Sequence, residues 1–391
     1  MDERTRLIRD ATARPGGRRG VNPPLERATT LLNARAGDLR DAGLGPVYGI
    51  EGLGVHRALE AALGELEGAS HVFLAPTGLA AVTIGVMALA QPGDQVLATD
   101  AVYGPTRRFL DRQMRRWGVG ARYYPATASA EDVFDQAGEA PALVLIEQPG
   151  SLTFDLADVP ALARLARARG WTTIMDNTWA AGLLFKPLAH GVDVSVQALS
   201  KYVAGHSDVF LGSIATNDQA LAARIAATIE DMGWFVSPDD AWLALRGLRT
   251  LPVRLAEHGR NALKVARWLE AQPEVARVLY PALPGAPGHG IWKRDYSGAS
   301  GLMGVVLAPG APEAAEALLD ALQLFGLGYS WGGFESLATY EDPQLDRRIH
   351  REDLGGPLIR LHIGLEAPED LIADLRRGLD RYAGVAASST S

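Results

Sequence analysis

Three short motifs place reactive side chains directly after apolar segments of the chain. The segment TTIMD ends at Asp176, and the segment VSVQAL is followed by Ser200 and Lys201. After HVFLA comes the sequence Pro-Thr-Gly-Leu, residues 76–79, which is typical of a helix start. A helix start offers free N–H groups to a phosphate, a carboxylate pairs with a cation, and a lysine amine forms a Schiff base with a carbonyl.

Each motif taken alone has an ordinary structural explanation. Residues 76–79 could simply cap a helix, Asp176 could cap the next one, and a single lysine is most often a solvated surface residue. Together, however, the motifs meet the needs of one cofactor, pyridoxal phosphate, which has a phosphate, a ring nitrogen and a carbonyl. Tyr103, which follows the segment QVLAT, adds an aromatic ring that could stack on the cofactor ring.

These residues fall within an alternating pattern of strands and helices. Most of the apolar runs of strand length are separated by patterns typical of amphipathic helices or by loops. The runs are residues 71–75, 95–99, 142–147, 172–176, 194–199 and 210–215. The pattern predicts an α/β fold with a mostly parallel sheet covered by helices, in which ligands bind beyond the carboxyl ends of the strands.

Changes in composition and in the pattern of apolar residues divide the chain into three parts. Residues 1–52 are rich in Arg, Gly and Pro and are expected to form an N-terminal arm, and residues 53–247 carry the strand–helix alternation. Residues 248–391 contain long helical patterns, two predicted strands and a last helical pattern before a Ser/Thr-rich tail expected to be disordered. This last part is predicted to form a smaller α+β domain.

The composition argues against several classes of function. A net charge of −8 argues against nucleic-acid binding, and the absence of cysteine excludes disulfides, thiol nucleophiles and Cys-based metal sites. The eight histidines are scattered, and the chain contains no phosphate-binding P-loop. No metal site is therefore predicted. No apolar run is long enough to span a bilayer, and the N-terminus mixes acids with arginines, so we expect no membrane partner and a cytoplasmic protein.

A set of longer motifs resembles the Cys/Met-metabolism family of fold-type I pyridoxal-phosphate enzymes. The motifs occur in the family's order and include VYGPTRRF, DNTWAAGLLFKPL, SVQALSKYVAGHSD, RGLRTLPVRL, YSWGGFESL and IRLHIGLE. The similarity covers almost the whole chain after the arm. It implies the fold-type I transferase architecture, with a mostly parallel seven-stranded sheet in the large domain and a smaller α+β C-terminal domain.

The resemblance also implies roles for individual residues around the cofactor. Lys201 would hold pyridoxal phosphate and, once released by the substrate, act as the base for the Cα proton. Asp176 would pair with the ring nitrogen, and Tyr103 would stack on the ring and take part in catalysis. The phosphate would be bound by Gly78, Leu79 and Ser200.

On the substrate side, the resemblance implies that Arg360 binds the α-carboxylate, helped by Ser330. Tyr329 and Trp331 would line the pocket for the distal part of a sulfur amino acid. Tyr48 would reach the cofactor as a catalytic residue from a neighbouring subunit, which implies at least a dimer with shared active sites. The usual assembly of the family is a homotetramer.

The activity implied by this resemblance is carbon–sulfur β-elimination, which converts L-cystathionine to homocysteine, pyruvate and ammonia in methionine biosynthesis. Related activities stay open, namely a lyase for cysteine S-conjugates or sulfoxides, a γ-lyase and a γ-replacing synthase. A catalytically weakened member of the family is a third possibility. It is suggested by one departure from the family pattern.

The departure lies beside Tyr48. The family commonly has the pattern Tyr-x-Arg, whose arginine crosses the dimer to the phosphate, whereas this chain has Tyr48-Gly49-Ile50 followed by Glu51. A charge-assisted phosphate contact is thus replaced by an apolar residue. Arg57 or an arginine of the N-terminal arm is the expected substitute.

Overall fold

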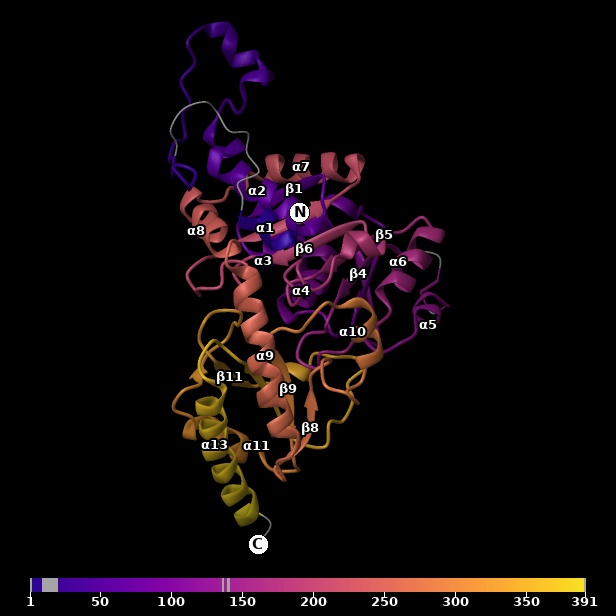
Figure 1. The fold of residues 1–391 in the computed structure, drawn as a ribbon. Helices are drawn as coiled ribbons and strands as arrows, with labels where there is room; N and C mark the ends of the chain where they lie inside the picture. The colour runs from indigo at the N-terminus through magenta and orange to yellow at the C-terminus, as the bar shows by residue number, and fades with distance from the viewer. Residues whose placement is uncertain (1, 9–19, 136, 139–140, 390–391) are drawn as a thin grey trace.

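Two β-sheets organise the chain (Figure 1). In the computed structural model, the described residues are 2–8, 20–135, 137–138 and 141–389. The seven-stranded sheet has the order β1-β7-β6-β5-β4-β2-β3. Its strands are β1 (His71–Ala75), β2 (Gln95–Thr99), β3 (Gly120–Tyr124), β4 (Pro141–Glu147), β5 (Thr172–Asp176), β6 (Val194–Ala198) and β7 (Gly212–Thr216).

All strand pairs in this sheet are parallel except those of β7, which runs antiparallel to β1 and β6. The predicted α/β class and the mostly parallel seven-stranded sheet are confirmed. The six apolar runs match six of the strands, but β3 was not among them. Its sequence, GARYY, lies at the edge of the sheet and is only partly buried, which explains its weak apolar signal.

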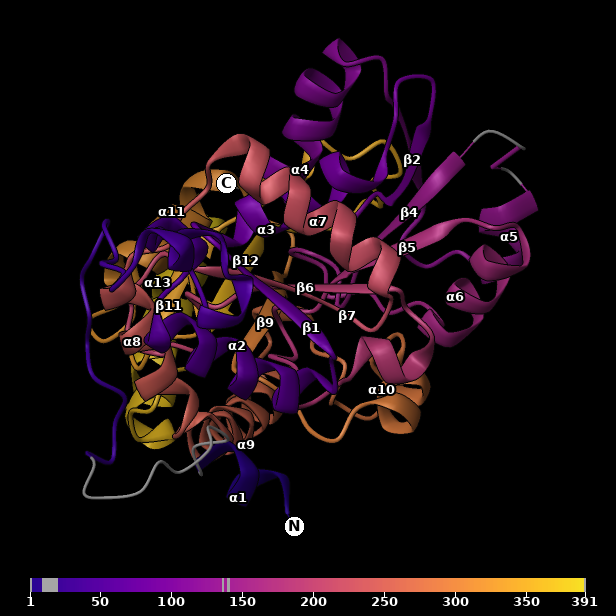
Figure 2. The same cartoon turned by 90° about the horizontal axis from the view of Figure 1, so that it is seen from above.

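Helices cover both faces of the large sheet because alternate strand residues point to opposite sides. Leu143 and Leu145 of β4 pack with α3 and α7, whereas Val144 and Ile146 pack with α5, α6 and the C-terminal part of the chain. Figure 2 shows α7 crossing the first of these faces. The helices of this region are α2 (Gly54–Glu67), α3 (Gly78–Leu89), α4 (Gly104–Phe109), α5 (Ala130–Asp135), α6 (Val159–Ala168) and α7 (Gln219–Met232).

The second sheet has five strands in the order β10-β11-β12-β9-β8. They are β8 (Val275–Leu279), β9 (Leu302–Leu307), β10 (Gly326–Leu327), β11 (Leu337–Tyr340) and β12 (Leu358–His362). The accompanying helices are α8 (Pro238–Leu248), α9 (Leu251–Glu270), α10 (His289–Asp295), α11 (Pro312–Ala321), α12 (Asp342–Leu345) and α13 (Pro368–Ser389). The proposed domain boundary at 247 and 248 falls at the end of α8, and α9 then leads toward the smaller sheet (Figure 1). The Ser/Thr-rich tail was expected to be disordered, but helix α13 continues through it as far as Ser389.

The N-terminal arm packs against α2 through its first helix, where Leu7 is buried, and its later part stands away from the two sheets (Figure 1). It begins with α1 (Glu3–Ile8) and contains the short 3₁₀ turns Ala36–Arg40, Ala42–Leu44 and Gly49–Glu51. Leu32 is 95% exposed, and Leu44 and Ile50 are also exposed. Within the described part of the chain, no helix combines the length and apolar character needed to cross a membrane.

Candidate active site

The carboxyl ends of β4, β5 and β6 bring three ionisable side chains to one edge of the large sheet. Glu147 and Asp176 are paired in register at the ends of β4 and β5, and Lys201 follows β6 after a short turn. The edge is where the parallel-sheet rule locates a ligand. The structure thus brings together Asp176 and Lys201, which the sequence analysis had joined only by their positions at strand ends.

Lys201 is a largely buried amine with an altered acidity. Its Nζ donates a hydrogen bond to Ser330 Oγ at 2.6 Å and lies 5.3 Å from the centre of the Trp331 ring. Burial and the positive charge of Arg360 lower the pKa of Lys201 to about 8, against the opposing effect of Asp176. An amine with this pKa can be neutral and nucleophilic near physiological pH.

Asp176 is held as an acceptor at the end of β5. Its Oδ1 accepts hydrogen bonds from the Thr178 hydroxyl at 2.5 Å and from the Thr178 N–H at 3.0 Å. Burial raises the pKa of Asp176, while these hydrogen bonds and the charge of Lys201 lower it. A buried carboxylate in this position is stabilised by a cation, and a protonated pyridine nitrogen is a cation of the right kind.

The start of α3 forms a close-fitting cradle beside the end of β6. A Cβ atom added to Gly78 would stand 2.2 Å from the Cβ of Ala198, so only glycine allows this approach. Thr77 caps the helix by accepting the N–H of Ala80 at 3.0 Å, and no acceptor among the described residues meets the N–H groups of Gly78 and Leu79. Free N–H groups at a helix start suit a phosphate, and Ser200, two residues after Ala198, adds a hydroxyl.

Arg360 comes from β12 of the smaller sheet. Its Nε lies 3.3 Å from Oε1 of Glu341, a fully buried carboxylate, and its Nη2 is buried without a hydrogen-bond partner among the described residues. Burial lowers the pKa of Arg360, and the charge of Glu341 raises it. The unpaired end of the guanidinium is suited to bind a carboxylate, as expected for the α-carboxylate of an amino acid.

The loop 329–332 closes over the lysine. Ser330 has a φ of 99° and Gly332 a φ of 87°, and a Cβ atom on Gly332 would stand 2.8 Å from the backbone nitrogen of Tyr202. Trp331 packs against the Tyr202 ring at 5.4 Å between centroids. Tyr329 is 73% exposed, at the outer end of this loop.

Tyr103 lies on the large-domain side of the site, directly before α4. Its backbone N–H donates to Glu147 Oε2 at 2.6 Å, and its side chain is about half exposed. Burial and the charge of Glu147 raise the pKa of Tyr103, while the charge of Arg360 lowers it. The tyrosine therefore shares the electrostatic environment of both Asp176 and Arg360.

Tyr48 lies outside this group of residues in the single chain. It is about half exposed on the arm, where it forms an isolated bridge with Thr30. Arg57, the expected substitute for the missing phosphate-binding arginine, donates to Glu60 Oε2 at 2.6 Å and to the Glu51 backbone oxygen. The role of both residues at a shared site stays a prediction.

Several residues that the sequence analysis did not single out support the site. Glu147 binds the backbone of Tyr103, Thr178 binds Asp176, and Glu341 pairs with Arg360. Arg254 of α9 donates to the backbone oxygens of Tyr202, Val203 and Gly247 and so fixes the turn after Lys201. The described residues contain no group of His, Cys, Asp or Glu that could hold a metal ion.

The site has the features that pyridoxal phosphate requires, and the comparisons with known proteins agree. The family model for the Cys/Met metabolism PLP-dependent enzymes matches residues 4–380. The chain is 43% identical to the cystathionine beta-lyase of Bordetella avium, over 93% of both chains. It is 46% identical to a putative cystathionine beta-lyase of Rhizobium johnstonii, over 93% of this chain and 92% of the relative.

A solved structure shares the fold. The cystathionine gamma synthase of Xanthomonas oryzae pv. oryzae has a TM-score of 0.90 and 30% identity, over 98% of this chain and 99% of that one. The family and the cofactor predicted from the motifs are thereby confirmed. This chain belongs to the Cys/Met metabolism family of pyridoxal-phosphate-dependent enzymes.

Proposed function

We propose that the chain is a carbon–sulfur β-lyase that converts L-cystathionine and water to homocysteine, pyruvate and ammonia. The observation that carries this proposal is the buried Lys201, whose pKa of about 8 reflects the nearby charges of Asp176 and Arg360. The Nη2 atom of Arg360 has no hydrogen-bond partner among the described residues. The matching relatives named as cystathionine beta-lyases support the choice of substrate.

Each residue of the site has a defined task in this reaction. Pyridoxal phosphate, when bound, supplies an electron sink for negative charge at the substrate Cα. Arg360 binds the α-carboxylate and orients the Cα–H bond, and Lys201 removes the Cα proton as a general base. The ammonium form of Lys201 then supplies a proton to the departing sulfur. Trp331, which packs against Tyr202, and Tyr329 form the wall for the distal part of the substrate.

Product identity tests the proposal. Purified enzyme is incubated with cystathionine, cystine and S-alkyl cysteines, and the oxo acids are identified by mass spectrometry, with Lys201→Ala as the inactive control. Pyruvate and homocysteine from cystathionine are the expected products. 2-Oxobutyrate as the main product would indicate a γ-lyase instead, and bound cofactor without turnover of any of these compounds would favour a non-catalytic member.

The same proposal includes a homo-oligomer with shared active sites, in the cytoplasm. The exposed arm supports this assembly, because Leu32, Leu44 and Ile50 present apolar surface near Tyr48 in the sequence. In the proposed dimer, Tyr48 reaches the cofactor of the partner subunit. A tetramer would pair two such dimers, and the mass measured by light scattering distinguishes the two assemblies.

Mixed oligomers test the shared site. Lys201→Ala and Tyr48→Ala chains are each expected to be nearly inactive alone, whereas a mixed dimer contains one site with both native residues. Co-expression should therefore recover about a quarter of the wild-type activity per chain, as expected for random pairing. No recovery despite mixed dimers on a native gel would contradict a site shared in this way.

The missing phosphate-binding arginine gives a separate test. We propose that Arg57 takes over this role, although in the single chain it is engaged with Glu60 and Glu51. Arg57→Met should lose cofactor faster than the wild type during dialysis, with the arm variant Arg40→Met as a comparison. Equal cofactor retention in Arg57→Met and the wild type would eliminate Arg57 and leave the arm arginines as candidates.

A further inference from the structure

His362 is a buried histidine at the end of β12 that has no task in the proposed reaction. Only 1% of its surface is exposed. Its side chain lies on the same face of the strand as that of Arg360, because alternate residues of a strand point to the same side. The strand that presents the guanidinium for the substrate carboxylate therefore also presents an imidazole ring.

The Nε2 atom of His362 contacts the loop 329–332 and the residue that follows it. The backbone nitrogen of Gly332 lies 3.1 Å from this atom, and the backbone oxygen of Gly333 lies at the same distance. In one tautomer Nε2 accepts from the Gly332 N–H, and in the other it donates to the Gly333 oxygen. The ring is therefore hydrogen-bonded to this part of the chain in either tautomer.

The loop has few other hydrogen bonds that could hold it in place. Among the described residues, the only other hydrogen bond to residues 329–333 is the one that Lys201 Nζ donates to Ser330 Oγ at 2.6 Å. His362 is thus the side chain of the smaller sheet that fixes the loop, while Lys201 is the group that the loop covers.

Two further rings hold His362 in its orientation. The His258 ring lies 5.2 Å from the His362 ring and the Tyr202 ring lies 5.9 Å from it, measured between centroids. His258 Nδ1 donates to the backbone oxygen of Ile363 at 2.8 Å and so fixes the end of β12. Tyr202, the residue after Lys201, also packs against Trp331 of the loop.

His362 is neutral over the physiological pH range. Burial, with a further contribution from the adjacent His258, lowers the pKa of His362 to about 3. The contact with the loop therefore needs no charge on the ring. A neutral substitution at this position likewise removes no charge from the surroundings of Lys201.

We propose that His362 is a positioning residue, which holds the loop 329–332 over Lys201. Through the loop it keeps Ser330 in hydrogen-bond contact with the amine and the centre of the Trp331 ring 5.3 Å from it. A loop released from the histidine would move away and admit water to the amine. The inference deepens the proposed function and rests on it only in assigning the Cα proton to Lys201.

The acidity of Lys201 in the apoenzyme tests this role without turnover. Competitive acetylation followed by peptide mass spectrometry gives the pH midpoint at which the amine loses its proton. Burial is the main cause of the lowered pKa of Lys201, so water admitted by a displaced loop should raise the midpoint, and the same water replaces Ser330 as acceptor. His362→Leu, which removes the hydrogen bond to the loop, should raise the midpoint by about one pH unit.

Rescue by glutamine gives the decisive outcome. The amide of His362→Gln reaches about as far as Nε2 and can accept from Gly332 or donate to Gly333, so the midpoint of Lys201 should stay close to that of the wild type. Equal shifts in the leucine and glutamine variants would overturn the proposal and leave His362 a structural residue. A midpoint that is unchanged or lower in His362→Leu, despite a lower melting temperature, would overturn it as well.

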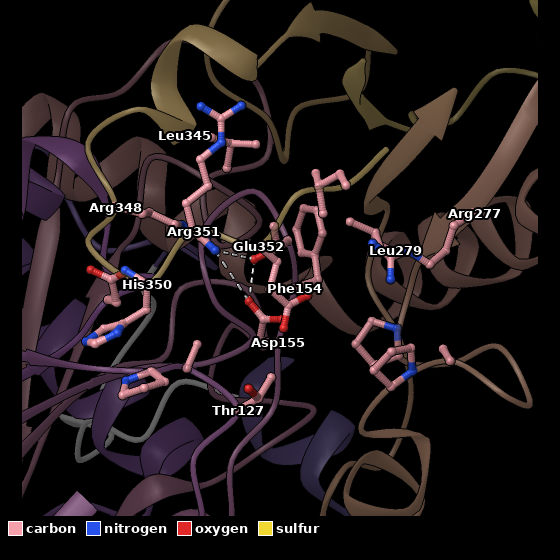
Figure 3. Close-up of a pocket in the computed structure, with 18 of the residues that line it drawn as sticks. Thr127, Phe154, Asp155, Arg277, Leu279, Leu345, Arg348, His350, Arg351 and Glu352 are labelled. Atoms are coloured by element: carbon pink, nitrogen blue, oxygen red, sulfur yellow. Dashed lines mark hydrogen bonds and ion pairs between the residues drawn. The ribbon is translucent and has the colours of Figure 1, made fainter. Parts of the chain in front are cut away.

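His350→Leu is the matched control. His350 is exposed and lines a separate pocket of about 410 Å³, together with Asp155 and Arg348 (Figure 3). None of the described residues that line this pocket belongs to the loop 329–332. The control should leave the midpoint of Lys201 unchanged, and a shift equal to that of His362→Leu would contradict the loop as its cause.

If His362→Leu fails to fold, His362→Asn takes its place in the comparison with His362→Gln. Both variants carry an amide, but the shorter side chain of asparagine ends near the position of Nδ1 and does not reach the loop. The midpoint should then rise in the asparagine variant alone, and equal midpoints would overturn the proposal. Absence of β-elimination with these shifts intact would count against the proposed function alone.

Discussion

Ser330 Oγ lies 2.6 Å from Lys201 Nζ, so a loop before β11 in the smaller sheet contacts the reactive amine at the edge of the large sheet. The serine adopts this position with a φ of 99°, a backbone conformation that L-residues other than glycine rarely adopt. Strain of this kind is retained where the surrounding structure fixes it, here through Trp331 and Gly332.

Two substitutions separate the strain from the hydrogen bond. Ser330→Ala and Ser330→Gly both remove the hydroxyl, and each should lower kcat/KM about tenfold through the lost contact with Lys201. Only glycine also relieves the strained backbone, so Ser330→Gly should be more stable than Ser330→Ala by about 1 kcal/mol in urea unfolding. Equal stability of the two variants would show that the φ angle at this position carries no cost.

The acidity of Lys201 can be measured in the apoenzyme. Competitive acetylation followed by peptide mass spectrometry should give a midpoint near pH 8 for this amine, with exposed Lys293 as the internal reference. Arg360→Gln removes a positive charge and should raise the midpoint, while Asp176→Asn should lower it. A wild-type midpoint near the ordinary lysine value of about 10.4 would contradict the role assigned to burial.

The strand-end residues of the site could be predicted because their signal is local. Asp176 and Lys201 each follow an apolar strand directly, and the rule that parallel sheets bind ligands at the carboxyl edge brings them together. Gly78 was found in the same way, at the start of a helix. Strand β3 was not predicted because a strand at the edge of a sheet needs few apolar residues.

The supporting residues could not be predicted because their partners are distant in the sequence. Nothing near Glu147 in the chain indicates that it binds the backbone of Tyr103, and nothing near Glu341 indicates Arg360. Arg254 appeared in the sequence only as one residue of the motif RGLRTLPVRL. Its partners, the backbone oxygens after Lys201, become visible only when α9 is packed against that turn.

Arg254 should be essential for the stability of the turn that follows Lys201. Arg254→Met leaves the backbone oxygens of Tyr202 and Val203 without their donor, which should cost about 3 kcal/mol of unfolding free energy and weaken cofactor binding. Arg254→Lys keeps the charge but lacks the planar fork, so it should restore only part of the loss. Arg260→Met, at an exposed position of the same helix, is the control in urea unfolding.

Gly205 depends on the same arginine. Its φ is 72°, and a Cβ atom would overlap sterically with Arg254 Nη1. Gly205→Ala should therefore reproduce the loss of stability seen in Arg254→Met. A stable, fully loaded Gly205→Ala enzyme would contradict the tight contact between the turn and α9.

Glu67 should make the stability of the protein depend on pH near neutrality. It is only 2% exposed, its Oε2 accepts the Ser195 hydroxyl at 3.1 Å, and burial raises its pKa to about 7. Between about pH 4.5 and 7 the unfolded chain releases this proton while the folded chain retains it, so stability falls as the pH rises through this window.

Glu67→Gln lacks this titration while keeping the shape of the protonated side chain. The variant should be close to the wild type at pH 4.5 and more stable above pH 7, by on the order of 3 kcal/mol, since each pKa unit corresponds to about 1.4 kcal/mol. Urea unfolding at several pH values measures the difference, and Glu65→Gln on the same helix, where Glu65 is exposed and pairs with Arg6, is the control. If the difference in unfolding free energy between Glu67→Gln and the wild type stays constant from pH 4.5 to 8, Glu67 is ionised in the folded protein throughout this range. Its contacts with Ser195 and Gln197 would then be those of a buried carboxylate.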